Sequence, residues 1–70
     1  MRDFQLGELV WILSFEDDFY LLSKQTIVEI LEDHVECEDD YNTFHVAFED
    51  IYRNKEEALT EMISRLKEMQ

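Results

Sequence analysis

The chain has 70 residues and a formal net charge of −12, which arises from 18 Asp and Glu against six Lys and Arg. A surface this acidic repels nucleic acid and anionic lipid, and it attracts basic proteins. Nine aromatic side chains argue against a disordered acidic chain, because such chains are usually poor in aromatics. We therefore expect a single folded domain, residues 1–70, that carries its charge on its surface.

The cysteine content and the apolar runs give a first expectation of location. Cys37 is the only cysteine, and together with the lack of a signal peptide it favours a reducing, cytoplasmic setting. The apolar run from Leu9 to Phe15 is far shorter than the roughly 20 apolar residues that span a bilayer. The sequence therefore predicts a protein that is not embedded in a membrane.

The first half of the chain reads as strands. Gly7 is the only glycine, and it predicts a bend that leads into a strand at Leu9–Leu13. Every residue of that strand is apolar, which is typical of a strand buried on both faces. The acids of residues 14–19 indicate a loop. A short strand at Phe19–Leu22 and a turn at residues 23–25 follow.

Residues 26–37 give a partly alternating pattern. Thr26, Ile27 and Val28 favour a strand, although a helix over residues 26–34 is the alternative. The phase of the alternation changes between Ile30 and Val35, which indicates a β-bulge.

The next segment is the clearest strand of the sequence. Residues 37–42 contain no glycine, so they predict a loop longer than a two-residue hairpin turn. Phe44, Val46 and Phe48 then alternate with His45, Ala47 and Glu49. Ile51 and Tyr52 predict a short last strand.

A helix is expected at Lys55–Met69. Asn54 is a favoured N-cap residue, and Glu57 stands three positions later, as in a capping box. Apolar residues then recur at helical spacing: Ala58, Leu59, Met62, Ile63, Leu66 and Met69. The predicted fold class is α+β: a small, strongly bent antiparallel sheet or barrel of three to five strands within residues 8–53, followed by one amphipathic helix that covers an open face.

Three segments of the chain, "LGELVWIL", "TIVEI" and "FHVAFEDIYRNKEEA", together resemble a known group of proteins. They are similar to small barrel proteins common in phages and prophages of low-GC bacteria, and the similarity covers most of the chain. The residues in the matching places are Phe44, Val46, Phe48, Ile51, Tyr52 and the run 56–58. The resemblance implies a Src-homology-3-like barrel with a C-terminal helix and no catalytic residues. This chain departs from the pattern between the second and third strands, where an acidic loop replaces the usual glycine turn.

No motif predicts catalysis, a metal or a cofactor. His34, Cys37 and His45 lack the spacing of paired zinc ligands, and a fourth ligand is hard to find. The glycine of a calcium loop is absent from both carboxylate-dense stretches. Trp11 fits either a core position or an exposed anchor for a partner. We expect a protein that is not an enzyme.

The charge pattern leaves two functions open. No Lys or Arg lies between Lys24 and Arg53, a window of 28 residues with nine acids. The first hypothesis is a phage-type inhibitor of anti-restriction or anti-CRISPR type, which imitates DNA and binds a basic nucleic-acid-binding protein of a bacterial host. The alternative is an accessory adaptor or structural protein whose acidity serves only solubility. The residues expected to bind the partner are the acids Glu16, Asp17, Asp18, Glu29, Glu32, Asp33, Glu36, Glu38, Asp39, Asp40, Glu49 and Asp50.

Overall fold

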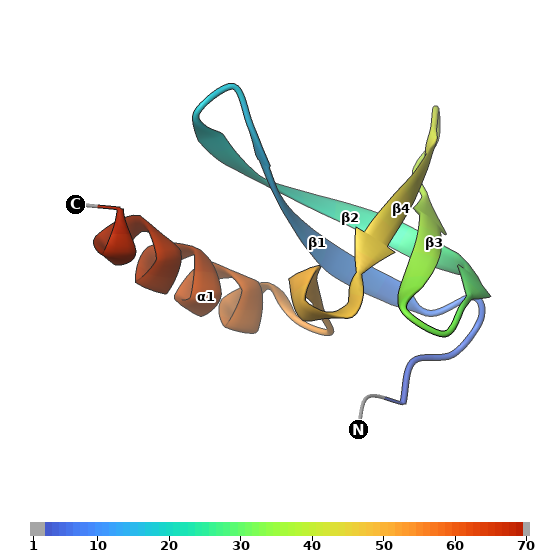
Figure 1. Cartoon of the computed structure of the whole chain (residues 1–70). Helices are drawn as coiled ribbons and strands as arrows, with labels where there is room; N and C mark the ends of the chain where they lie inside the picture. Colours follow the sequence, from blue (N-terminus) through green and yellow to red (C-terminus); the bar gives the residue numbers. More distant parts are fainter. Residues whose placement is uncertain (1–2, 70) are drawn as a thin grey trace.

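A five-stranded antiparallel sheet followed by one helix forms the structure, a computed structural model that describes residues 3–69 (Figure 1). The strands lie in the order β4-β3-β2-β1-β5. The elements in chain order are β1 (Leu9–Glu16), β2 (Phe19–Ile30), β3 (His34–Glu38), β4 (Thr43–Ala47), the short 3-10 helix η1 (Phe48–Asp50), β5 (Ile51–Tyr52) and α1 (Lys55–Glu68). This confirms the predicted α+β class.

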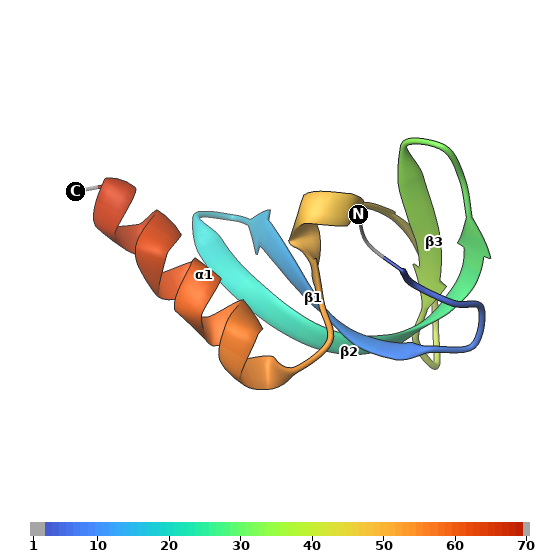
Figure 2. The same ribbon diagram turned by 90° about the horizontal axis from the view of Figure 1, so that it is seen from below.

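The sheet is strongly bent. Figure 2 shows β2 curving along its length, so that β3 stands at an angle to the hairpin of β1 and β2. The last strand, β5, follows η1 and pairs with β1 at the other edge from β4. This strand order is consistent with a Src-homology-3-like barrel.

The core lies on the concave face of the sheet. It consists of the buried side chains Val10, Ile12, Ile27, Val35, Cys37, Val46 and Ile51, against which Phe4 and Phe48 pack. Alternate residues of a strand point to opposite faces, so Val35 and Cys37 fix which face of β3 is inside.

The expected bend at Gly7 is confirmed. This residue has a φ of 84°, a value that favours glycine, and its N–H donates to the carbonyl of Ile27 over 2.8 Å.

The β1–β2 hairpin is longer than predicted. β1 continues to Glu16, β2 is continuous through residues 23–25, and only Asp17 and Asp18 form the turn. The expected loop at 14–19 and the expected turn at 23–25 are therefore wrong. Both turn residues have positive φ, 52° and 68°, as a tight two-residue turn requires, and Asp tolerates that region better than most residues. The polar residues at 23–25 belong to the strand, where the buried Gln25 donates from Nε2 to Ser23 Oγ.

Residues 26–37 form two strands and not one. β2 ends at Ile30, residues 31–33 turn the chain, and β3 pairs back along β2. The change of phase between Ile30 and Val35 is therefore this turn, and the predicted bulge there is wrong. A shift of register does occur earlier, between Ile27 and Glu29. The alternative of a helix over residues 26–34 is also wrong.

The helix begins where the sequence predicts. The Asn54 side chain accepts a hydrogen bond from the N–H of Glu57 at 2.8 Å, which satisfies one of the free amides of the first turn. α1 contacts β1 and β5. The ammonium of Lys55 lies 5.5 Å from the ring centre of Trp11, so the helix covers the outer face of β1, opposite the core.

The helix covers less of the sheet than expected. In α1 only Ala58 is buried, whereas Ile63, Leu66 and Met69 at its C-terminal end are 50%, 43% and 58% exposed. β5 has only two residues, so the sheet offers little surface to a helix of 14 residues. Figure 1 shows α1 running out from β5 toward the side of the β1–β2 turn. The expectation that the whole apolar stripe lies against the sheet is wrong.

Candidate functional site

The twelve acids expected to bind a partner lie in three places. Glu16, Asp17 and Asp18 form the tip of the β1–β2 hairpin, and Glu49 and Asp50 belong to η1. The other seven lie on β2 and β3 and in the two loops that join β2, β3 and β4: Glu29, Glu32, Asp33, Glu36, Glu38, Asp39 and Asp40. We call these seven residues the acidic face. Figure 1 places the hairpin tip at the opposite side of the molecule from β3 and β4, so the twelve acids do not form one surface.

Strand register brings the glutamates of the acidic face together. Glu29 pairs across the strands with Glu36, which pairs in turn with His45. Because Val35 and Cys37 face the core, Glu36 and Glu38 both point outward from β3. When protonated, the carboxyl of Glu29 can donate a hydrogen bond to the carboxylate of Glu36, and this raises the pKa of Glu29 above its ordinary value. The face therefore places two acidic side chains directly opposite each other on paired strands.

Two histidines adjoin these carboxylates. His34 and His45 lie on neighbouring strands, and His34 Nε2 is 3.2 Å from His45 Nδ1. Asp33 Oδ1 lies 2.7 Å from His34 Nδ1, and this hydrogen bond lowers the pKa of Asp33. Glu36 Oε1 lies 3.8 Å from His45 Nε2. Their spacing in the sequence does not show that the two rings meet, because they meet only through the register of β3 and β4.

Asp39 has a structural task in its loop. Its carboxylate accepts hydrogen bonds from the N–H groups of Tyr41 and Asn42, each at 2.8 Å, and these bonds lower the pKa of Asp39. The bonds hold the loop of residues 39–42, which confirms that this connection is longer than a two-residue turn. Asp39 is therefore less suited than Asp40 to test binding, because replacing it alters the loop.

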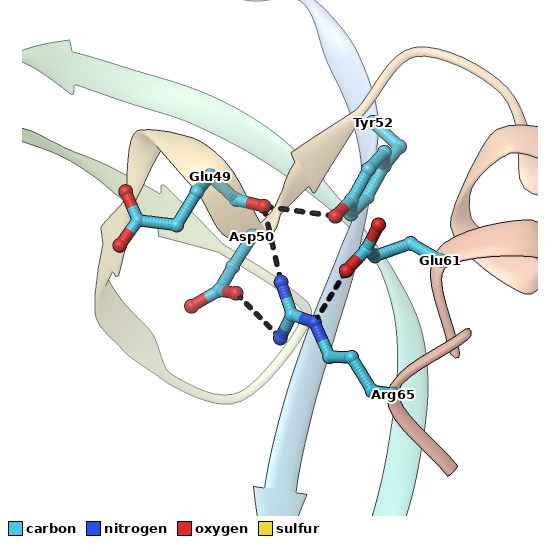
Figure 3. Close-up of polar contacts among 5 residues, drawn as sticks. All are labelled: Glu49, Asp50, Tyr52, Glu61 and Arg65. Carbon is cyan, nitrogen blue, oxygen red and sulfur yellow. Dashed lines mark hydrogen bonds and ion pairs between the residues drawn. The ribbon is translucent and has the colours of Figure 1, made fainter. Parts of the chain in front are cut away.

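The acids of η1 are engaged with the helix. Figure 3 shows Arg65 of α1 between η1 and Glu61: Nη1 lies 3.1 Å from Asp50 Oδ1, and Nε lies 2.8 Å from Glu61 Oε2. These hydrogen bonds, that to Glu61 foremost, raise the pKa of Arg65. The carbonyl oxygen of Glu49 accepts from Arg65 Nη2 and from the Tyr52 hydroxyl. Asp50 thus serves to attach α1 to η1.

The basic side chains make contacts away from the acidic face. Lys24 and Lys55 lie over the ring of Trp11, which is half-buried, with Nζ at 5.9 Å and 5.5 Å from the ring centre. Arg53 Nε lies 2.7 Å from Glu8 Oε2, and this ion pair lowers the pKa of Glu8. Trp11 is therefore a packing residue for lysine side chains as well as for the helix.

Burial makes the single thiol unreactive. Cys37 is fully buried in the core, and desolvation raises its pKa to about 11. A thiol reacts as the thiolate, so at neutral pH Cys37 behaves as a small apolar residue. Within residues 3–69, no group of three or more His, Cys, Asp or Glu side chains could hold a metal ion.

Comparison with known proteins gives no relative. No protein-family model matches the chain, and neither a curated protein nor a solved structure matches it. Across the described residues, α1 is too short and too polar to cross a membrane.

The pKa shifts of the carboxyl groups predict how stability depends on pH. Glu29 has a raised pKa, so the folded state gains stability as the pH falls from 7 through that pKa. Glu8, Asp33 and Asp39 have lowered pKa values, so the stability that they contribute is lost only as the pH falls further, through those lowered values. We expect the melting temperature by circular dichroism to hold or rise between pH 7 and about 5, and to fall below about pH 4.

A variant at Glu29 provides the control for this pH profile. Glu29→Gln removes the group whose protonation relieves the contact with Glu36, so its melting temperature should rise less than that of the parent between pH 7 and about 5. A parent protein that loses stability steadily over this range would contradict the raised pKa of Glu29.

Proposed function

We propose that this protein is a non-catalytic, phage-type inhibitor that acts in the cytoplasm of a bacterial host and binds a basic nucleic-acid-binding protein through its acidic face. Proteins that bind DNA obtain much of their affinity by neutralising phosphates with Lys and Arg. Carboxylates on a fixed sheet offer the same Lys and Arg an alternative set of anions. Binding of the acidic face would thus exclude DNA by competition.

The observation that carries this proposal is the contact between Glu29 and Glu36. Like charges directly opposite each other on paired strands destabilise a sheet, and a Lys in either place would relieve this cost. No Lys or Arg occurs between Lys24 and Arg53, and the positive side chains described above contact Trp11, Glu8, Asp50 and Glu61. A surface that serves only solubility mixes both signs. The segregation of charge therefore favours a binding role.

Charge reversal on the acidic face tests the proposal. The partner is first captured from a bacterial lysate, eluted in steps of increasing salt, and tested for competition by duplex DNA. Replacing Glu29, Glu36 and Glu38 with Lys should then slow association with that partner roughly tenfold or more at low salt, because electrostatic attraction sets the association rate. The control triple variant replaces Glu16, Glu56 and Glu68 with Lys. These three side chains are exposed, and their replacement changes the net charge by the same amount as the test variant does.

The control should bind nearly as fast as the parent. Equal slowing by both triple variants would show that only net charge matters and would contradict a defined acidic face. A partner whose binding is unaffected by duplex DNA would contradict the mechanism of competition.

A second candidate, an adaptor that binds through apolar surface, is favoured by one observation. The C-terminal end of α1 exposes Ile63, Leu66 and Met69. The β1–β2 hairpin, toward whose turn the helix runs, exposes Phe15, Phe19 and Leu21. An adaptor of this kind would bind an apolar segment of another protein with little dependence on salt, and Leu66→Glu would abolish binding. Steep weakening by salt, together with unchanged binding of Leu66→Glu, would favour the inhibitor.

A further inference from the structure

The two histidines beside the acidic face, His34 and His45, each direct a ring nitrogen at the other ring. His34 Nε2 and His45 Nδ1 are 3.2 Å apart, while the other nitrogen of each ring faces a carboxylate. Asp33 Oδ1 is 2.7 Å from His34 Nδ1, and Glu36 Oε1 is 3.8 Å from His45 Nε2. The four side chains come from β3, β4 and the turn before β3. Each ring thus faces the other imidazole, with a carboxylate hydrogen-bonded behind His34 and a carboxylate at ion-pair distance behind His45.

These surroundings determine where the ring protons lie. Asp33 accepts a hydrogen bond from His34 Nδ1, which leaves the lone pair of His34 Nε2 directed at His45 Nδ1. A proton on His45 Nδ1 bridges the two rings over 3.2 Å, and a metal ion can replace that proton while the charge of Glu36, 3.8 Å from His45 Nε2, favours the remaining ring proton on Nε2. At His34 the arrangement is the one seen at metal sites, where the ring nitrogen that does not bind metal donates to a carboxylate.

We propose that His34 Nε2 and His45 Nδ1 together bind a divalent transition-metal ion, with water molecules in the remaining coordination positions. Zinc–imidazole bonds are about 2.0–2.1 Å long, so two nitrogens 3.2 Å apart subtend an angle of about 100° at the ion, between the octahedral and tetrahedral values. No movement of the two strands is needed to reach this geometry.

The chemistry of the ligands selects the class of metal. Imidazole nitrogen suits Zn²⁺, Ni²⁺ and Cu²⁺, whereas Mg²⁺ and Ca²⁺ prefer oxygen. Asp33, Glu36 and the nearby Glu29 place negative charge around the ion, and no Lys or Arg of β3 or β4 opposes it. Because fewer than three protein ligands converge within residues 3–69, the site is an open one that exchanges its water ligands.

Calorimetric titration of the free protein with Zn²⁺ and with Ni²⁺, at about pH 8 where imidazole is available as a ligand, tests this site. A large excess of Mg²⁺ is present throughout, because it occupies carboxylates without competing for imidazole. We expect one ion bound per chain. His34→Ala and His45→Asn should each abolish this binding, and circular dichroism should show both variants folded, since both side chains project from the outer face of the sheet. Glu38→Gln, on the same face but without contact to either ring, should bind as the parent does.

Two further measurements separate this site from general attraction of cations. Asp33→Asn should weaken binding about 10–100-fold, the usual effect of losing a carboxylate that orients a metal-binding histidine. In ¹⁵N spectra of the imidazole rings, Zn²⁺ should shift Nε2 of His34 and Nδ1 of His45. Binding that survives both histidine variants, or metal on the opposite ring nitrogens, would overturn the proposal. The experiment needs no partner protein, so its outcome is independent of the proposed inhibitor function.

Discussion

Leu13→Ala should lower the free energy of unfolding by about 2–5 kcal/mol, the usual cost of truncating a buried leucine. Leu13 is 1% exposed and lies on the outer face of β1, since its neighbour Ile12 belongs to the core on the other face. It pairs with Leu22 of β2, on the face to which Trp11 also belongs and over which α1 packs. A small domain has little stability to lose, so this change should leave much of the protein unfolded at 37 °C.

Leu66→Ala is the matched control for Leu13→Ala. It removes the same atoms from an apolar residue of α1 that is 43% exposed, so we expect a cost below about 1 kcal/mol. Both variants are compared with the parent by urea denaturation, followed by circular dichroism. Equal losses of stability would show that the C-terminal end of α1 packs as firmly as its first turns, and would contradict the exposure of Leu66.

Asp18→Gly should raise the free energy of unfolding by about 1 kcal/mol. Asp18 has a φ of 68° in the two-residue turn between β1 and β2, and a left-handed conformation costs most residues about 1–2 kcal/mol relative to glycine. The variant also removes one of three consecutive carboxylates at the hairpin tip. Asp-Gly is among the preferred sequences for this kind of turn.

Asp40→Gly serves as the control for this gain. Asp40 is also an exposed loop aspartate, but it lacks a positive φ, so glycine there adds only freedom to the unfolded chain and should lower stability slightly. Thermal melting of the two variants at the same salt concentration gives the comparison. A gain for Asp40→Gly equal to that for Asp18→Gly would show that charge removal, and not the backbone conformation, is responsible.

Features that depend on neighbouring residues were predictable from the sequence. The alternation from Phe44 indicates β4, although that strand ends at Ala47, and Phe48 and Glu49 lie in η1. Asn54 followed by Glu57 indicates where α1 begins. Gly7 indicates the bend before β1. In each case a local pattern is enough, because the hydrogen bonds or the burial involved are made within a few residues or by one periodic face.

Features that depend on pairing were not predictable in the same way. Ser23, Lys24 and Gln25 look like a turn, but they pair with β1 as part of β2, where Gln25 is buried and donates to Ser23. The turns at residues 17–18 and 31–33 contain no glycine, so the sequence did not mark their positions. The meeting of His34 with His45, and of Glu29 with Glu36, follows from strand register, which composition does not reveal.

The contact of Arg65 with η1 and the pairing of lysines with Trp11 have an electrical consequence. Residues 25–52 contain nine acids and no Lys or Arg, whereas the chain from Arg53 onward contains four acids and four bases and is formally neutral. The net negative charge is therefore unevenly distributed: β3, β4 and the loops that flank them are strongly negative, whereas the segment that contains α1 is close to neutral. In the field of a charged body such a molecule rotates before contact, so that β3 and β4 lead the approach to a cationic surface and trail behind on approach to an anionic one.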